Sequence, residues 1–247
     1  SHKAILTINC THLCNAKCSF CYNGITFAND GDFVESTDED LLRTIEFAKL
    51  AGVQVVAFSG GEPTLNPQKL YDLVSTTMPS FKEGRLHTNG FQLLVDVTTV
   101  DGRNVPLIKA LIDAGLFGCS VSLAHYDRDK NAQIMRFSGT YKGLSDEELR
   151  YLAKLKSEKF SPRLSCFMLE EGICNVREIL SYIQFGANLG FENFIFRAST
   201  EIPNEYKRSG EFEKGNQKAI SNIDPIVECL IKEHGFSEIF TLHKSDA

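Results

Sequence analysis

Four of the eight cysteines lie close together near the start of the chain, at Cys10, Cys14, Cys18 and Cys21. Thiolates bind soft metals, and the last three, at offsets of four and three residues, can wrap a single cluster from one loop. A closed zinc site needs four ligands, and Cys10 or His12 could complete one. Zinc loops usually bring two separated cysteine pairs, however, and Cys10 ends an apolar run where a small buried thiol fits. The spacing therefore predicts a metal centre, either a three-cysteine iron–sulfur cluster or a four-ligand zinc loop.

A second group of unusual residues is the run Gly60-Gly61-Glu62-Pro63, which follows an apolar segment. Two glycines let a backbone come close to a ligand, and a carboxylate there can accept hydrogen bonds from an ammonium group. The alternative is a tight turn between a strand and a helix, with no ligand.

These groups must be positioned by short β-rich runs that alternate with amphipathic helical stretches. Several runs are continuously apolar, as strands buried on both faces are. Helix starts are indicated by Ser36 with Glu39, Ser145 with Glu148, Asn175 with Glu178, Asn66-Pro67 and Asp224-Pro225. The predicted strands are Ala4–Asn9, Val53–Phe58, Arg85–Thr88, Cys119–Leu123, Arg163–Leu169 and Asn193–Arg197. Six strands, each followed by helical sequence, predict an α/β fold: a partial (β/α)6 barrel of parallel strands with outer helices.

The chemically interesting residues share one place in this scheme, the carboxyl ends of the predicted strands. The cysteine run follows the first strand, Gly60 to Pro63 the second, and Thr88 to Gly90 the third. In parallel β/α architectures these ends meet at one mouth, where ligands bind. We therefore expect distant segments to converge on one cavity.

Composition bounds the classes of protein that the chain can belong to. The 247 residues are 43% hydrophobic and 23% charged, which excludes intrinsic disorder and low-complexity scaffolds. The net charge of −6, with no basic block, disfavours a nucleic-acid partner. No apolar run approaches the roughly 20 residues of a membrane helix. Clustered thiols without a secretory signal favour metal ligation over disulfides, so we expect a cytoplasmic protein in a reducing compartment.

We expect one domain over residues 3–247, because no linker, repeat or composition break divides the chain. The polar segment from Ser199 to Gly215 is expected to form a loop or lid. The chain ends shortly after a strand-like run, Phe236 to Leu242, so a C-terminal segment could be missing from it.

The run Cys14-Asn15-Ala16-Lys17-Cys18-Ser19-Phe20-Cys21, together with Gly60-Gly61-Glu62-Pro63, resembles the radical S-adenosylmethionine (SAM) superfamily. The resemblance extends in weaker form from about Ile5 to Arg197. It implies that Cys14, Cys18 and Cys21 hold three irons of a [4Fe-4S] cluster and leave the fourth to SAM. Reductive cleavage of SAM would then give a 5′-deoxyadenosyl radical that abstracts hydrogen from a substrate.

The resemblance also implies roles for other residues, each with a structural alternative such as core packing, a turn, a cap or an ion pair. The implied SAM-binding residues are Phe20, Gly60, Gly61, Glu62, Asn89, Ser122, Ser165 and Arg197; the substrate candidates are Tyr126, Asp127, Asn131, Arg136 and Glu170. Many relatives carry an acidic residue where this chain has Ala124, which puts the role of the fourth strand end in doubt. Arg197 could bind the SAM carboxylate or an anionic substrate.

The other four cysteines are too dispersed for an auxiliary cluster, so a single-cluster enzyme acting on a small molecule is the first hypothesis. A peptide-modifying maturase and a non-enzymatic zinc or iron–sulfur module are the alternatives. The first hypothesis also implies a low-potential electron donor such as flavodoxin or ferredoxin.

Overall fold

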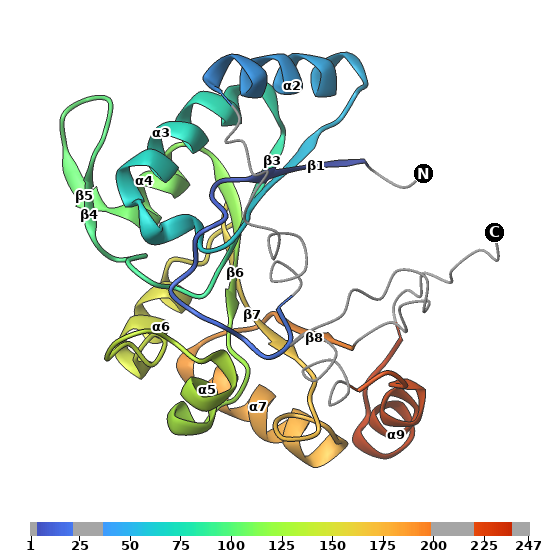
Figure 1. The fold of residues 1–247 in the computed structure, drawn as a ribbon. Coiled ribbons are helices and arrows are strands. Elements are labelled where there is room, and N and C mark those ends of the chain that lie inside the picture. Colours follow the sequence, from blue (N-terminus) through green and yellow to red (C-terminus); the bar gives the residue numbers. More distant parts are fainter. Residues whose placement is uncertain (1–3, 22–36, 199–219, 239–247) are drawn as a thin grey trace, which may run out of the picture.

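The computed structural model of the chain describes residues 4–21, 37–198 and 220–238. Its main feature is a six-stranded parallel sheet in the order β1-β2-β3-β6-β7-β8 (Figure 1). The strands are β1 (Ile5–Asn9), β2 (Val55–Ser59), β3 (Glu83–Thr88), β6 (Leu116–Ser122), β7 (Ser161–Phe167) and β8 (Phe194–Arg197). All six predicted strands are present within a few residues, which confirms the partial barrel.

Helices connect the strands and lie along the sheet (Figure 1). They are α2 (Asp38–Leu50), α3 (Pro67–Thr77), α4 (Leu107–Asp113), α5 (Arg128–Met135), α6 (Asp146–Lys154), α7 (Val176–Leu189) and α9 (Asp224–His234), with short 3-10 turns η1 (Pro63–Leu65) and η2 (Met78–Ser80). In Figure 1, α2, α3 and α4 lie beside the half of the sheet that holds β1 to β3, and α5, α6 and α7 lie beside the other half.

The predicted helix starts are largely confirmed. Ser145 and Glu148 form a capping box, and the side chains of Asn66 and Asn175 cap α3 and α7. Two starts were wrong by one residue. The capping box of α2 joins Thr37 and Asp40 rather than Ser36 and Glu39, since the Asp40 carboxylate accepts from the Thr37 amide at 3.0 Å. The N-cap residue of α9 is Ile223 rather than Asp224.

The two faces of the main sheet differ in what they carry. On one face Phe58, Leu86, Val121 and Leu164 are almost fully buried in the core beneath the helices. Because side chains alternate along a strand, the intervening positions point to the other side, which we call the inner face. Register places Arg85 opposite Gly118, His87 opposite Ser120, Ser120 opposite Arg163, and Ser122 opposite Ser165 on that inner face.

A small antiparallel hairpin, β4 (Asp96–Thr98) and β5 (Asn104–Pro106), was not predicted. Asp101-Gly102, a dipeptide typical of tight turns, lies between its strands and could have indicated it. Among the described residues, no helix combines the length and apolar character needed to cross a bilayer. Residues 199 to 215 and most of the run from Phe236 to Leu242 lie outside the described residues.

Candidate functional site

The cysteine loop, residues 10–21, begins at the carboxyl end of β1 and is bonded to the turn that follows β2. The Cys10 amide donates to Ser59 O at 2.8 Å, and the Gly61 amide donates to Thr11 O at 2.6 Å. The Glu62 amide donates to the carbonyl of Leu13 at 2.8 Å. The two motifs that the sequence singled out are therefore joined backbone to backbone.

The two glycines of this turn are needed for that close approach. A Cβ built on Gly60 would lie 2.4 Å from Thr11 O, and one on Gly61 would lie 2.0 Å from Leu13 O. Gly60 also has a φ of 132°, a conformation that favours glycine. The sequence predicted that the glycines admit a ligand; the structure shows them admitting the cysteine loop, and their role toward a ligand stays a prediction.

The far half of the cysteine loop rests on α5 and on the end of β7. The Lys17 amide donates to Arg136 O at 3.1 Å, and Phe20 stacks on Phe167 with ring centroids 4.9 Å apart. The Cys18 thiol lies 3.7 Å from the sulfur of Met135. The loop is thus anchored at both ends, which orders its backbone independently of a bound group.

The thiols of Cys14, Cys18 and Cys21 lie close enough to influence one another. Burial and then the neighbouring charges of Glu62 and Cys21 raise the pKa of Cys14 to about 11. Burial, followed by the charges of Cys21 and Cys14, raises the pKa of Cys18 well above its usual range. Because a metal centre stabilises the thiolate form, bound iron would offset both effects.

The sulfurs of Cys14, Cys18 and Cys21 do not all lie within 4.8 Å of one another. Within the described ranges, the one group of three potential ligands that do is Cys229, Glu233 and His234, far along the chain. Sulfurs bound to one zinc lie at most about 4.6 Å apart, twice the Zn–S distance. At least one pair among the three thiols is therefore farther apart than in a mononuclear zinc site.

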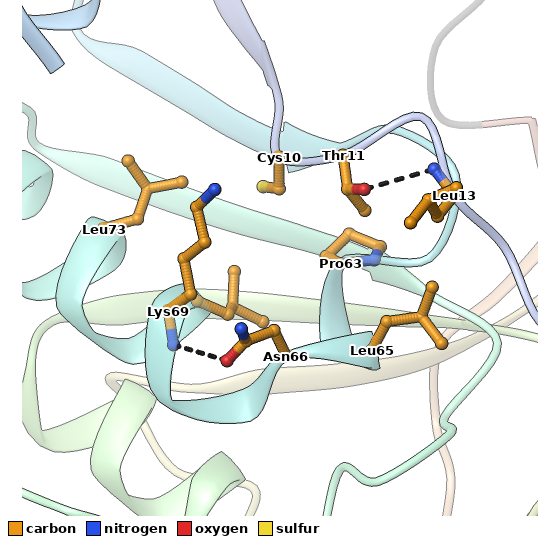
Figure 2. Close-up of a pocket in the computed structure, with 9 residues that line it drawn as sticks. Cys10, Thr11, Leu13, Pro63, Leu65, Asn66, Lys69 and Leu73 are labelled. Atoms are coloured by element: carbon orange, nitrogen blue, oxygen red, sulfur yellow. Dashed lines mark hydrogen bonds between the residues drawn. The ribbon is translucent and has the colours of Figure 1, made fainter. Parts of the chain in front are cut away.

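Cys10 lies apart from the other three cysteines. Its thiol lies 3.8 Å from Ile8 O, and burial raises its pKa to about 12. It lines a pocket with a volume of about 260 Å³. Figure 2 shows this pocket between the start of the cysteine loop and α3. The lining residues are Cys10, Thr11, Leu13, Pro63, Leu65, Asn66, Lys69, Leu70 and Leu73. This placement favours a buried structural thiol over a fourth metal ligand.

Glu62 is the buried acid at the centre of the site, with 2% of its surface exposed. Its Oε1 accepts from the Thr64 amide at 3.1 Å and the Thr88 hydroxyl at 2.5 Å, and its Oε2 accepts from the Asn89 amide at 2.6 Å. Burial raises the pKa of this carboxyl, while these hydrogen bonds oppose the rise. Glu62 thus ties the turn after β2 to the end of β3, and Oε2, which accepts one hydrogen bond from the described residues, retains a lone pair for a ligand.

Asn89 continues this connection into the cysteine loop. Its Nδ2 donates to Asn15 Oδ1 at 2.7 Å, and its Oδ1 accepts from the Phe91 amide. Within the part of the chain that the structure describes, Asn15 Nδ2 and Ser19 Oγ are buried without a hydrogen-bond partner. Buried donors of this kind call for an acceptor, and the sulfides of a cluster or the oxygens of SAM would supply one. Sequence reasoning placed Thr88 at this strand end without a role of its own, and it missed Asn15 and Thr64, which lie within or beside the motifs it used.

The remaining predicted SAM-binding residues lie on the inner face. Ser122 and Ser165 are register partners at neighbouring strand ends, and Arg197 ends β8 opposite Phe167. Ser165 is buried and Arg197 is exposed. The structure brings these three to one side of the sheet, and their contacts with SAM stay predictions.

The predicted substrate residues have structural partners of their own. Tyr126 donates its hydroxyl proton to Glu178 at 2.9 Å, and Asp127 caps α5. Asn131 is buried and accepts from the Ala124 amide, and Arg136 is the left-handed residue that ends α5. Glu170 is exposed in the turn after β7. These contacts explain the residue types without a substrate, so a substrate role for them stays untested.

Comparisons with known proteins fit this site. The family described as the radical SAM superfamily matches residues 8–183. A probable GTP 3′,8-cyclase of Thermococcus kodakarensis is 26% identical over 85% of this chain and 61% of its own length. A probable GTP 3′,8-cyclase of Methanocella arvoryzae is 28% identical over 57% of the chain and 41% of its own length. The chain thus spans less than two thirds of the length of these curated relatives.

Among solved structures, Streptococcus suis SuiB bound to S-adenosylmethionine matches 93% of this chain and 48% of its own, with a TM-score of 0.60 and 18% identity. That likeness shows the fold. Since the family match covers more than two thirds of the chain and includes both the cysteine loop and the Gly60–Pro63 turn, the chain belongs to the radical SAM superfamily, whose cofactors are a [4Fe-4S] cluster and S-adenosylmethionine.

Proposed function

We propose that the chain carries the catalytic core of an enzyme that cleaves SAM reductively and abstracts hydrogen from a small-molecule substrate. The observation that carries this proposal is the docking of the cysteine loop onto the Gly60–Pro63 turn, which brings Cys14 and Cys18 within electrostatic reach of Cys21 and of the buried Glu62. When bound, the cluster and SAM supply the 5′-deoxyadenosyl radical that performs the abstraction.

The residues of the chain would bind and orient these groups. Cys14, Cys18 and Cys21 would each ligate one iron, and the anchored loop would hold them without large rearrangement. Glu62 would accept a hydrogen bond from the SAM ammonium through Oε2, the oxygen that otherwise accepts from the Asn89 amide. Phe20, stacked on Phe167, would fix the backbone between the last two ligands.

The relatives suggest a finer candidate for the substrate. Several curated relatives, from archaea and from Clostridium perfringens, are named GTP 3′,8-cyclase. We therefore propose GTP as the first substrate to test. A peptide is the second, because a solved structure of SuiB is described with its precursor peptide; that protein is 20% identical and supports the fold only.

The donor of the electron would be a low-potential protein such as flavodoxin or ferredoxin. All eight cysteines are free of disulfides, which supports a reducing, cytoplasmic environment.

The test compares Cys18→Ala with Cys10→Ala after anaerobic reconstitution with iron and sulfide. Cys18→Ala should lose the visible absorbance of the cluster and the release of 5′-deoxyadenosine from SAM with dithionite, whereas Cys10→Ala should keep both. Equal loss in the two variants, or a colourless zinc protein in the wild type, would contradict the three-cysteine site. Mass change of GTP and other metabolites, scored beside 5′-deoxyadenosine, then tests the substrate.

A further inference from the structure

Arginines gather on the inner face of the sheet, below the strand ends that hold the cysteine loop. Gly118 of β6 is the register partner of Arg85 of β3 on one side and of Ser161 of β7 on the other. Arg163 comes two residues after Ser161, so its side chain points to the same face of the sheet as Arg85 and Gly118. A Cβ on Gly118 would lie 3.0 Å from Nη2 of Arg163 and 3.9 Å from Cγ of Arg85. The absence of a side chain at Gly118 therefore lets the two arginines meet over one strand.

His87 lies on the same face of β3 as Arg85, and Arg197 ends β8 opposite Phe167. His87 is the register partner of Ser120, which in turn pairs with Arg163. Burial, and then the charges of Arg197, Arg163 and Arg85, lower the pKa of His87 to about 4. The imidazole is therefore neutral near pH 7, and three guanidiniums act on it together.

Few carboxylates balance these charges. Glu83 forms an ion pair with Arg85, with Nη2 and Oε1 2.5 Å apart. Within residues 4–21, 37–198 and 220–238, no carboxylate lies within ion-pair distance of Arg163 or Arg197, and Arg163 Nε is buried without a hydrogen-bond partner. Burial and the charge of Arg85 lower the pKa of Arg163, and the charge of Glu83 opposes this shift.

Holding the Arg163 Nε away from water without an acceptor costs free energy, and arginine forks match the geometry of phosphate and carboxylate groups. We propose that Arg85, Arg163 and Arg197 form a site on the inner face that binds an oxyanion group of the substrate, a phosphate or a carboxylate. This inference rests on the proposed function in assigning the group to the substrate. It extends the predicted role of Arg197 to two arginines that the sequence did not single out.

The site would orient the substrate by its charged end. Arg85 and Arg163 lie on the face that also carries Ser122 and Ser165, and these two serines lie nearer the strand ends and the cysteine loop. Arg197, opposite Phe167, lies nearer still to the strand ends. An anion held by Arg85 and Arg163 would leave the uncharged part of the substrate directed toward that mouth. The site thereby positions the substrate and takes no part in bond breaking.

The test titrates the reconstituted wild-type protein with tripolyphosphate and, separately, with tricarballylate at low ionic strength, by calorimetry. Cluster absorbance is followed throughout, so that removal of iron by either anion is detected. At least one anion should bind, and the tighter one assigns the phosphate or the carboxylate. Arg163→Gln should weaken binding roughly tenfold to hundredfold, the loss of a hydrogen bond to a charged group.

The matched control is Arg43→Gln, which removes the same charge from an exposed arginine of α2. The affinity of Arg43→Gln for the anion should stay within about twofold of the wild-type affinity. If Arg163→Gln does not fold, Arg163→Lys keeps the charge and removes the fork, and should still weaken binding severalfold. Absence of binding in the wild type, or equal affinity in wild type and every Arg163 variant, would overturn the proposal. Failure of the proposed function would instead appear as a wild type without a cluster or without 5′-deoxyadenosine.

Discussion

Replacing Glu62 with glutamine tests whether this side chain holds the site together as well as facing SAM. The glutamine amide would place an NH₂ where one carboxylate oxygen of Glu62 stands. At Oε1 it would meet the Thr64 amide and the Thr88 hydroxyl, so the less costly orientation puts it at Oε2, facing the Asn89 amide. Two donors would then face each other inside the protein.

The magnitude follows from that geometry. Losing a hydrogen bond to a charged acceptor costs about 1.5–3 kcal/mol, and leaving the buried amide of Asn89 unsatisfied adds about 1–3 kcal/mol. Glutamine regains part of this because it carries no charge to bury, and burial already raises the pKa of Glu62. We expect a net loss of about 2–4 kcal/mol in the free energy of unfolding, a fall in Tm of roughly 5–15 °C for a chain of this size.

The assay is urea denaturation of the protein without its cluster, followed by circular dichroism, with Glu39→Gln as the matched control. Glu39 is exposed and pairs with Arg43 four residues on, so its loss should cost about 0.5 kcal/mol or less. A Glu62→Gln protein as stable as the control would refute the idea that Glu62 joins the two strand ends. A destabilised variant that binds SAM with wild-type affinity would refute its contact with the ammonium group.

Two other substitutions test the packing of the site. Gly61→Ala should displace the cysteine loop, because its Cβ would lie 2.0 Å from Leu13 O, and should cut cluster content severalfold on reconstitution. The control is Gly102→Ala, where φ is 81° and no atom lies within 4 Å of the added Cβ. This variant should cost stability and leave cluster content unchanged. Equal cluster content in both would contradict the close approach. Burial, and then the nearby arginines, hold the pKa of His87 near 4 in the folded protein, against about 6.5 in the unfolded chain. The folded state therefore binds this proton more weakly, and the wild type should lose stability as pH falls from 6.5 toward 4. His87→Gln should lose less over that range in urea unfolding, and parallel pH curves for the two proteins would show that the imidazole is neither buried nor close to the arginines.

The strand order and the convergence of the motifs were predictable because they depend on local patterns. Continuous apolar runs marked the strands, and parallel topology then placed every strand end at one mouth. The roles of Gly60 and Gly61 were not predictable, since glycine indicates a close approach and does not say what approaches. The same limit applies to Asn131, whose burial and bond to the Ala124 amide depend on how α5 packs.

The inner-face arginines show a different limit. Arg85 and Arg163 both lie in predicted strands, but 78 residues separate them, and only strand register shows that they meet over Gly118. A single arginine in a strand is uninformative, because it can point to either face and pair with many acids. The signal lies in three arginines on the same face of β3, β7 and β8, and it needs the sheet order to be known first.

The two parts of the site carry opposite charge: Glu62 and the thiols make the mouth negative, and the arginines make the inner face positive. An anionic substrate therefore needs the arginines. Glu62 contributes to the raised pKa of Cys10, Cys14 and Cys18, so the mouth is already an unfavourable place for negative charge. Thiolates and sulfides add to that charge when the cluster is bound, and a phosphate approaching the mouth would be repelled. Arg85 and Arg163 on the inner face would offset the repulsion, because they lie farther from the strand ends than Ser122 and Ser165 do. An anionic substrate would therefore favour one orientation, with its charged end beside these two arginines and its uncharged part directed toward the cysteine loop.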